Sequence, residues 1–177
     1  MRVSGALLDL RTKMTFTISF RPIQPEDAAF LYEVYASTRA DEVRTWGWDQ
    51  AQQAAFLQMQ FAAQQQHYAF LEDKAEQQII LVDGQAVGRW IVLRHEREIL
   101  LADIALLPPY RNAGIGTRLI QRLQVEAAET RRPVRLQVEK TNQARQLYER
   151  LGFSVTDNAG VHWQMEWSAA EVINSFP

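Results

Sequence analysis

The 177-residue sequence contains no cysteine. Disulfide bonds, thiolate nucleophiles and thiolate metal ligands are therefore excluded. This absence fits a reducing compartment, and we expect the protein to be cytoplasmic. No apolar run approaches the roughly 20 residues that a membrane-spanning helix needs. The segment 1–13 is interrupted by Asp9 and Arg11 and makes a poor signal peptide.

An excess of charge of one sign is also missing. The chain has 19 Lys and Arg residues against 21 Asp and Glu residues, which gives a formal net charge of -2. This balance provides no general attraction to nucleic acid or to an anionic membrane, and we expect neither as a partner. The length and the 47% hydrophobic content suit one domain with a sizeable core. We expect that domain at 15–168, with an N-terminal extension at 1–14 and a C-terminal tail at 169–177.

The stretch at 106–117 organises the rest of the chain. It follows a nearly continuous apolar run at 99–106, which predicts a strand buried on both faces. Pro108 and Pro109 end that strand because neither can donate a backbone hydrogen bond. Apolar residues then recur at helical spacing and predict a helix that begins near Gly114. These residues are Ile115, Leu119, Ile120, Leu123 and Ala127.

The start of this helix is a candidate anion site. Its first N–H groups have no acceptor inside the helix, and they lie at the positive end of the helix dipole. Gly114 and Gly116 lack a Cβ, which allows a phosphate to approach the backbone, and Arg111 can add a charged contact. A P-loop is excluded because no lysine follows Gly116, and Leu119 replaces the third glycine of a dinucleotide fingerprint. A strand-to-helix turn that binds nothing remains open.

Strands are predicted on both sides of this stretch from apolar alternation. They are expected at 16–20, 78–82, 86–93, 99–106, 134–138, 153–155 and 161–167. The dipeptide Asp83-Gly84 and the polar segment 95–98 are hairpin signals, so three of these strands should form an antiparallel meander. The order of strand, helix and strand around 115–130 implies a parallel pair with a right-handed crossover.

Two further helices are predicted before the meander and one near the C-terminus. Pro25 opens the first, and a polar connection is expected at 37–48. Asp49 is the expected N-cap of the second, which continues to about Gln66. The last contains Asn142, Ala144, Leu147, Tyr148 and Leu151, and it ends at Gly152.

Two motifs resemble signatures of the GNAT superfamily of N-acetyltransferases. Residues 111–116 read Arg-Asn-Ala-Gly-Ile-Gly and match the pattern Arg/Gln-x-x-Gly-x-Gly/Ala. Residues 142–153 resemble the second signature, Asn-x-x-Ala-x-x-Leu-Tyr-x-x-Leu-Gly-Phe. In this chain Asn142 lies six residues before Tyr148, where the commoner spacing is seven. The resemblance extends over about 16–167.

The resemblance implies a fold and an activity. The fold is α/β (α+β), with a mixed, mostly antiparallel sheet of six to seven strands, helices on both faces and a splayed parallel strand pair that binds CoA. The activity is transfer of an acetyl group from acetyl-CoA to a primary amine of a small molecule or peptide, by direct attack and without a metal. A CoA-binding or interaction module without turnover is the alternative. A homodimer is left open.

Site residues follow from the same resemblance. The pyrophosphate is expected on 112–117, and the pantetheine is expected to pair like a strand with 104–106. A backbone N–H near Leu106 is expected to stabilise the oxyanion. The residues assigned to the donor are Ile104, Ala105, Leu106, Arg111, Asn112, Ala113, Gly114, Ile115, Gly116, Thr117 and Asn142.

The catalytic and acceptor residues each have more than one possible interpretation. Tyr148 is expected to protonate the departing thiolate, although it also fits an apolar core stripe. Asp103 is the first candidate for the general base and Glu139 the second, while Gln137 cannot act as a base. One alternative is that Asp103 is paired with an arginine. Another is that no dedicated base is needed and that water relays the proton. Trp46 either walls the acceptor pocket or packs at a helix entry.

Overall fold

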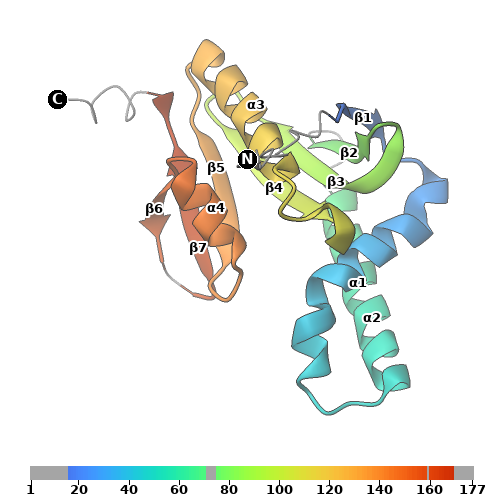
Figure 1. Ribbon diagram of the computed structural model, residues 1–177. Coiled ribbons are helices and arrows are strands. Elements are labelled where there is room, and N and C mark those ends of the chain that lie inside the picture. The colour runs from blue at the N-terminus through green and yellow to red at the C-terminus, as the bar shows by residue number, and fades with distance from the viewer. Residues whose placement is uncertain (1–15, 71–74, 159, 170–177) are drawn as a thin grey trace, which may run out of the picture.

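The computed structural model describes residues 16–70, 75–158 and 160–169. Seven strands within this part form one sheet in the order β1-β2-β3-β4-β5-β7-β6 (Figure 1). The strands are β1 (Ile18–Pro22), β2 (Ala75–Val82), β3 (Gln85–Arg94), β4 (Ile99–Leu106), β5 (Val134–Glu139), β6 (Ser154–Asp157) and β7 (His162–Trp167). The helices are α1 (Ala28–Arg44), α2 (Gln50–Ala69), α3 (Ile115–Thr130) and α4 (Ala144–Arg150).

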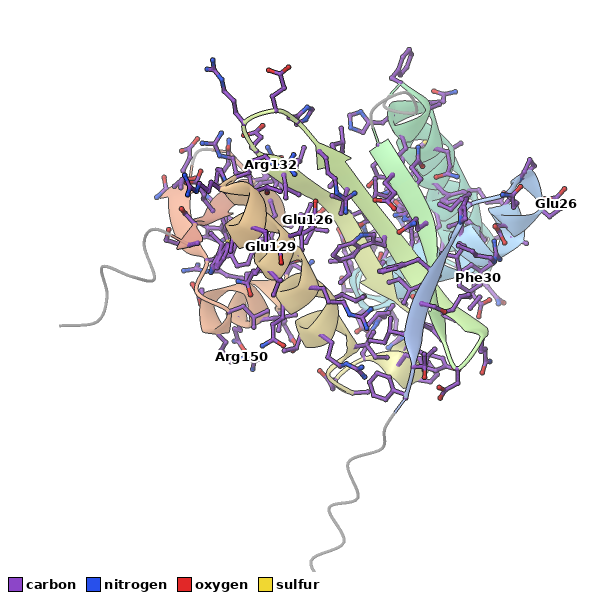
Figure 2. The ribbon with its side chains drawn as sticks, turned by 90° about the horizontal axis from the view of Figure 1, so that it is seen from above. Glu26, Phe30, Glu126, Glu129, Arg132 and Arg150 are labelled. Carbon is purple, nitrogen blue, oxygen red and sulfur yellow. The ribbon has the colours of Figure 1, made fainter. Side chains whose placement is uncertain are left out.

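Helices cover both faces of the sheet. The view from above in Figure 2 shows α3, with Glu126 and Glu129, on the opposite side of the sheet from α1, which carries Phe30. The larger core lies between the sheet and the α3 side, and it includes Trp90, Val92, Leu119, Ile120, Leu123, Tyr148 and Phe153. A smaller core, under α2, includes Tyr68, Ile91 and Leu93. The expected fold class is therefore confirmed.

The antiparallel meander β2-β3-β4 was correctly predicted. Asp83 and Gly84 form the β2-β3 turn with φ values of 49° and 82°, which suit a tight hairpin. The N–H of His95 donates to the carbonyl of Glu98 at 2.9 Å and closes the β3-β4 hairpin. This meander carries the chain directly to the start of α3.

The sheet is split between β4 and β5. These parallel strands pair only where Ile99–Leu101 faces Val134–Leu136, although β4 continues to Leu106 and β5 to Glu139. On its other side, β4 stays paired with β3 beyond a register shift that leaves Ala102 without a partner. Such a bulge bends the strand and increases its twist. The second half of β4 therefore separates from β5, which confirms the expected splayed parallel pair.

The largest difference from the prediction is the length of α1. The expected polar connection at 37–48 is wrong for its first part, because α1 continues to Arg44. No glycine or proline occurs between Ala28 and Thr45, so nothing local ends the helix earlier. Val43, only 1% exposed, anchors the added turns. The predicted N-cap is confirmed, since the Asp49 side chain accepts from the Gln52 N–H.

Candidate functional site

The N-terminus of α3 has unpaired backbone donors. Gly114 is the N-cap, with φ of 80°, a backbone conformation that favours glycine. The first hydrogen bond of the helix runs from the Arg118 N–H to the Gly114 carbonyl at 3.0 Å. The N–H groups of Ile115, Gly116 and Thr117 therefore have no acceptor inside the helix. Together with the positive end of the helix dipole they form a site suited to an anion.

Gly116 lies where β4, α3 and α4 meet. A Cβ added there would lie 3.5 Å from Leu147 Cδ2 and 3.9 Å from Ile104 Cδ1, which are ordinary contacts. Packing within the chain therefore does not require glycine at this position. Its small size leaves backbone accessible beside the N-terminus of α3.

The second half of β4 presents an unpaired edge toward β5. Leu107 donates its N–H to the Val87 carbonyl of β3 at 2.9 Å. Because backbone groups alternate in direction along a strand, those of Leu106 point the other way, toward the split. The Leu106 carbonyl accepts from Arg111 Nε at 2.8 Å, so the Leu106 N–H is the group left for a ligand. An extended molecule with amide groups could hydrogen-bond to this edge. The fold thus brings 104–106 and 112–117 together, at the end of β4 and the start of α3.

Arg111 is held by bonds within the chain. Its Nε donates to the Leu106 carbonyl at 2.8 Å, and its Nη2 donates to the carbonyl and the Oγ of Ser37 at 3.1 and 2.8 Å. The guanidinium therefore links the end of β4 to α1. Its predicted contact with a phosphate stays a prediction.

The helix expected to contain Asn142 begins only at Ala144, so Asn142 lies two residues before the start of α4. Its Oδ1 accepts from the Ala144 N–H at 2.9 Å, which satisfies one of the first donors of the helix. This local bond accounts for asparagine at this position without a ligand. Its role in binding the donor also stays a prediction.

Tyr148 lies in the core, as one of its two interpretations predicts, and its role as a general acid stays a prediction. It is 6% exposed, and its ring meets Phe153 edge to face at 5.7 Å, so it belongs to the core. Burial and the nearby charge of Asp103 raise the pKa of Tyr148. Within the described residues, no group forms a hydrogen bond with its hydroxyl. The Tyr148 hydroxyl is therefore protonated at neutral pH, and none of the described residues accepts a hydrogen bond from it.

Asp103 forms an ion pair with a buried arginine. Its Oδ2 lies 2.5 Å from Arg89 Nε, and the Arg89 side chain is only 2% exposed. Arg89 Nη2 also donates to Gln64 Oε1 at 3.0 Å, and the guanidinium lies 5.2 Å from the ring centre of Tyr68. The alternative of an aspartate paired with an arginine is thus observed. Arg89 was missed, although a charged residue inside the apolar run of β3 was an available signal.

Glu139, the second candidate base, is also in an ion pair. Arg39 Nη2 donates to its Oε1 at 2.7 Å, and Arg39 Nη1 donates to its Oε2 at 2.9 Å. The hydrogen bonds from Arg39 lower the pKa of the Glu139 carboxyl. The Glu139 carboxylate is therefore stabilised as an anion, which makes it a weaker base than a free carboxylate. Neither catalytic role is tested by these contacts.

Replacing Asp103 with asparagine is expected to destabilise the protein. The change leaves the buried charge of Arg89 without its counter-ion, a loss of about 3 kcal/mol in the free energy of unfolding. Urea denaturation measures this loss. As a matched control, Glu149→Gln breaks the exposed pair with Arg145 and should cost less than about 0.5 kcal/mol. Equal effects of the two changes would contradict the structural importance of the Arg89 pair.

Trp46 lies at the connection between α1 and α2, which projects away from the sheet in Figure 1. Its ring centre is 5.0 Å from Trp48 and 5.1 Å from Phe56, both edge to face. Trp46 nevertheless remains 37% exposed. Both tryptophans therefore pack at the entry of α2, and contact between Trp46 and an acceptor stays a prediction.

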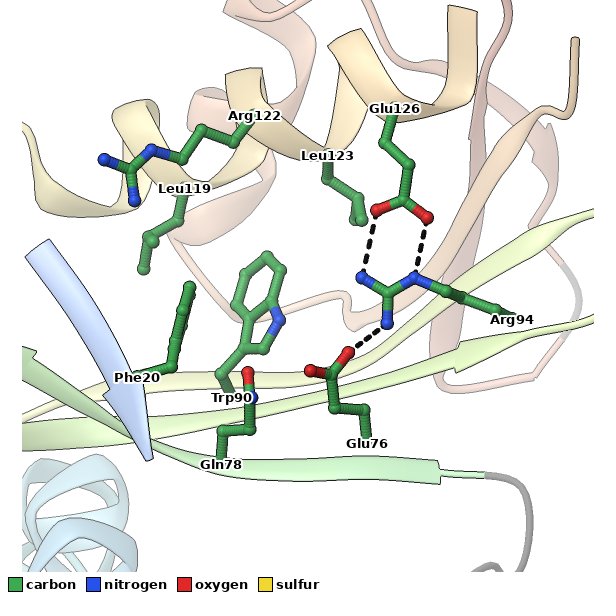
Figure 3. Close-up of a pocket in the computed structure, with 9 residues that line it drawn as sticks. All are labelled: Phe20, Glu76, Gln78, Trp90, Arg94, Leu119, Arg122, Leu123 and Glu126. Carbon is green, nitrogen blue, oxygen red and sulfur yellow. Dashed lines mark hydrogen bonds and ion pairs between the residues drawn. The ribbon is translucent and has the colours of Figure 1, made fainter. Parts of the chain in front are cut away.

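A separate cavity of about 240 Å³ lies between α3 and the strands β1 to β3 (Figure 3). Phe20 and Trp90 line it from the sheet. On its rim, Arg94 binds Glu126 at 2.6 and 2.9 Å and also contacts Glu76. None of the predicted site residues lines this cavity.

The described residues contain neither a membrane-spanning helix nor a metal cluster. No helix there is long and apolar enough to cross a membrane. In the same residues, no group of three or more His, Cys, Asp or Glu side chains could hold a metal ion.

The sequence was compared with known proteins. A family model described as "Acetyltransferase (GNAT) domain" matches residues 64–155. The [ribosomal protein bS18]-alanine N-acetyltransferase of Haemophilus influenzae is 33% identical over 79 residues, which are 44% of this chain and 54% of that protein. The chain therefore spans about half the length of this curated relative.

Solved structures share the fold at low identity. PaiA N-acetyltransferase from Thermoplasma acidophilum, in complex with coenzyme A, has a TM-score of 0.65 and 18% identity, covering 86% of this chain and 99% of that one. An acetyltransferase from Thermus thermophilus has a TM-score of 0.64 and 13% identity, covering 86% and 97%. The motifs, the split sheet and the family match agree: the chain belongs to the GNAT family of acetyltransferases.

Proposed function

We propose that the protein is an acetyl-CoA-dependent N-acetyltransferase that acts on a primary amine of a small molecule or peptide. The observation that carries this proposal is the split between β4 and β5 after Leu101, whose free edge leads directly to the N-terminus of α3. The edge offers backbone partners for the amides of pantetheine, and the helix N-terminus offers donors to a pyrophosphate. One continuous segment of the chain thus supplies both parts of a CoA site.

The proposed reaction is a direct transfer. The amine nitrogen attacks the thioester carbonyl, the new C–N bond forms and the C–S bond breaks. The Leu106 N–H, which points into the split, polarises the carbonyl and stabilises the oxyanion. Tyr148 donates its proton to the departing thiolate, a role that its unbonded and protonated hydroxyl supports.

Asp103 is proposed to act before the attack. The Asp103 carboxylate forms an ion pair with Arg89, and 20% of the Asp103 side chain remains exposed. The carboxylate can therefore bind the protonated amine, and water receives the proton that the amine must lose. Trp46 is proposed as a wall of the acceptor site.

One comparison supports a peptide amine as an acceptor. The name of the Haemophilus influenzae relative assigns it an alanine of a ribosomal protein as its substrate. We therefore include a peptide α-amine among the proposed acceptors, beside the amines of small molecules.

A panel of acceptors tests this proposal. Thiol release from acetyl-CoA is followed with peptides that begin with alanine, with a lysine-containing peptide and with small primary amines. Acetylated product, identified by mass spectrometry, is expected with at least one class. If calorimetry shows CoA binding but no acceptor is acetylated, the alternative of a binding module without turnover replaces the enzyme. Absence of CoA binding would reject both.

A further inference from the structure

The Arg39–Glu139 ion pair joins distant parts of the chain and has no part in the proposed reaction. Its two residues are 100 positions apart in the sequence, and the pair connects α1 to the last residue of β5. Both N–H···O contacts are short, at 2.7 and 2.9 Å, and they join the planar guanidinium to both carboxylate oxygens. This bidentate geometry fixes the relative orientation of the two side chains as well as their distance.

The same part of α1 is also bonded to β4. Arg111 contacts Ser37 on α1 and the Leu106 carbonyl at the end of β4. Ser37 and Arg39 are two residues apart on α1. A short segment of one helix is therefore connected to the ends of both β4 and β5.

These ends are the parts of the two strands that do not pair with each other. Ladder pairing stops at Leu101 and Leu136, so no backbone bond between the strands sets their separation beyond that point. The side chains of Arg111 and Arg39, acting through α1, connect the strands there. They form a brace across the open end of the split.

We propose that Arg39 is a positioning residue, whose ion pair with Glu139 fixes the separation of the β4 and β5 ends and so positions the acyl donor. This inference rests on the proposed function, because it takes the split as the donor site. Arg39 need not touch the donor. Its effect passes through β5, which forms one wall of the split.

The surroundings of the pair make it testable without unfolding the protein. Arg39 Nη1 also donates to Glu42 Oε2 at 3.2 Å, so the guanidinium keeps one partner when Glu139 is changed. The side chains of Arg39 and Glu139 are 32% and 36% exposed, so water can solvate the groups that remain. The variant Glu139→Gln keeps the shape of the side chain and removes its charge.

The test measures kcat, CoA affinity and donor selectivity for Glu139→Gln and Arg39→Gln. We expect kcat to fall roughly tenfold to a hundredfold, because small displacements of a reacting group have effects of that size. The Kd for CoA, measured by calorimetry, should change less than about threefold, because the N-terminus of α3 is untouched. The ratio of the rates with acetyl-CoA and butyryl-CoA should shift at least about tenfold, since the width of the split sets which acyl group fits. Partial unfolding would not change that ratio.

Two further variants complete the experiment. Arg44→Gln removes an exposed pair with Asp41 on the same helix and should leave kcat and the ratio unchanged. The double variant Arg39→Glu with Glu139→Arg should recover part of the lost kcat. Normal kcat and ratio in both single variants would overturn the proposal. If the wild type binds CoA and turns over, that result leaves the proposed function intact, whereas a wild type without CoA binding rejects the function itself.

Discussion

Replacement of Tyr148 with phenylalanine is expected to lower kcat for acetyl transfer by roughly 100-fold or more, while the Kd for CoA changes by less than about twofold. The change removes the proton that we assign to the departing thiolate. It removes no hydrogen bond between described residues, so the free energy of unfolding should change by less than about 1 kcal/mol. The edge-to-face contact with Phe153 is retained because the ring stays. Loss of turnover without loss of folding or CoA binding would show that Tyr148 acts as a general acid and not only as a core residue.

The pH dependence offers a second test of Tyr148. A general acid must carry its proton, and burial raises the pKa of Tyr148 above the ordinary tyrosine value of 10.0. A higher pKa extends the protonated range upward, so titration of Tyr148 should cause no decrease in kcat below about pH 10. As a matched control, Tyr32→Phe makes the same chemical change at a residue that faces Phe61 of α2, and should leave kcat near the wild-type value. Unchanged turnover in Tyr148→Phe would reduce Tyr148 to its role in packing.

A glutamate at position 116 is expected to weaken CoA binding by about 100-fold or more. The substitution places a negative charge beside the donors to which we assign the pyrophosphate, and like charges in close contact cost several kcal/mol. The same charge at a helix N-terminus is favourable for the protein alone. The added Cβ meets Leu147 and Ile104 at ordinary distances. Gly116→Glu should therefore weaken CoA binding without destabilising the fold.

The control at position 116 is alanine. Gly116→Ala adds only the Cβ that the structure accommodates, so CoA affinity should remain within about threefold of the wild type. Calorimetric titration with CoA gives both values, and circular dichroism confirms folding. Wild-type affinity in Gly116→Glu would mean that the pyrophosphate binds elsewhere.

The sequence was most informative for elements whose structure depends on residues close to one another in the chain. Two prolines, two glycines and a helical apolar period at 99–127 predicted the strand, the turn and α3, because each signal acts within a few residues. The hairpin at Asp83 and Gly84 was predicted for the same reason. The split between β4 and β5 came only from the resemblance, since no local pattern encodes where two strands stop pairing.

Partners distant in the sequence could not be predicted. Asp103 and Glu139 were identified as carboxylates of interest, but their arginines lie 14 and 100 residues away. Which arginine reaches which carboxylate depends on how α1 and β3 pack, and a sequence pattern does not contain that distance. The bond between Arg111 and Ser37 spans 74 residues and was missed for the same reason. The strand, turn and helix around the candidate site were thus predicted from the sequence. The ion pairs and hydrogen bonds that connect it to distant residues were not.

The interrupted pairing of β4 and β5 also bears on self-association. A free strand edge at the border of a sheet is a template for another polypeptide, and proteins protect such edges against aggregation. In this fold one free edge lies in the interior of the sheet, between β4 and β5, and the bonds of Arg111 and Arg39 link the ends of these strands to α1. An interior edge has a strand of the same sheet on its far side, whereas a neighbouring protein strand can add directly to an outer border. The free edge of β4 is therefore less open to other chains than an edge at the border of the sheet would be.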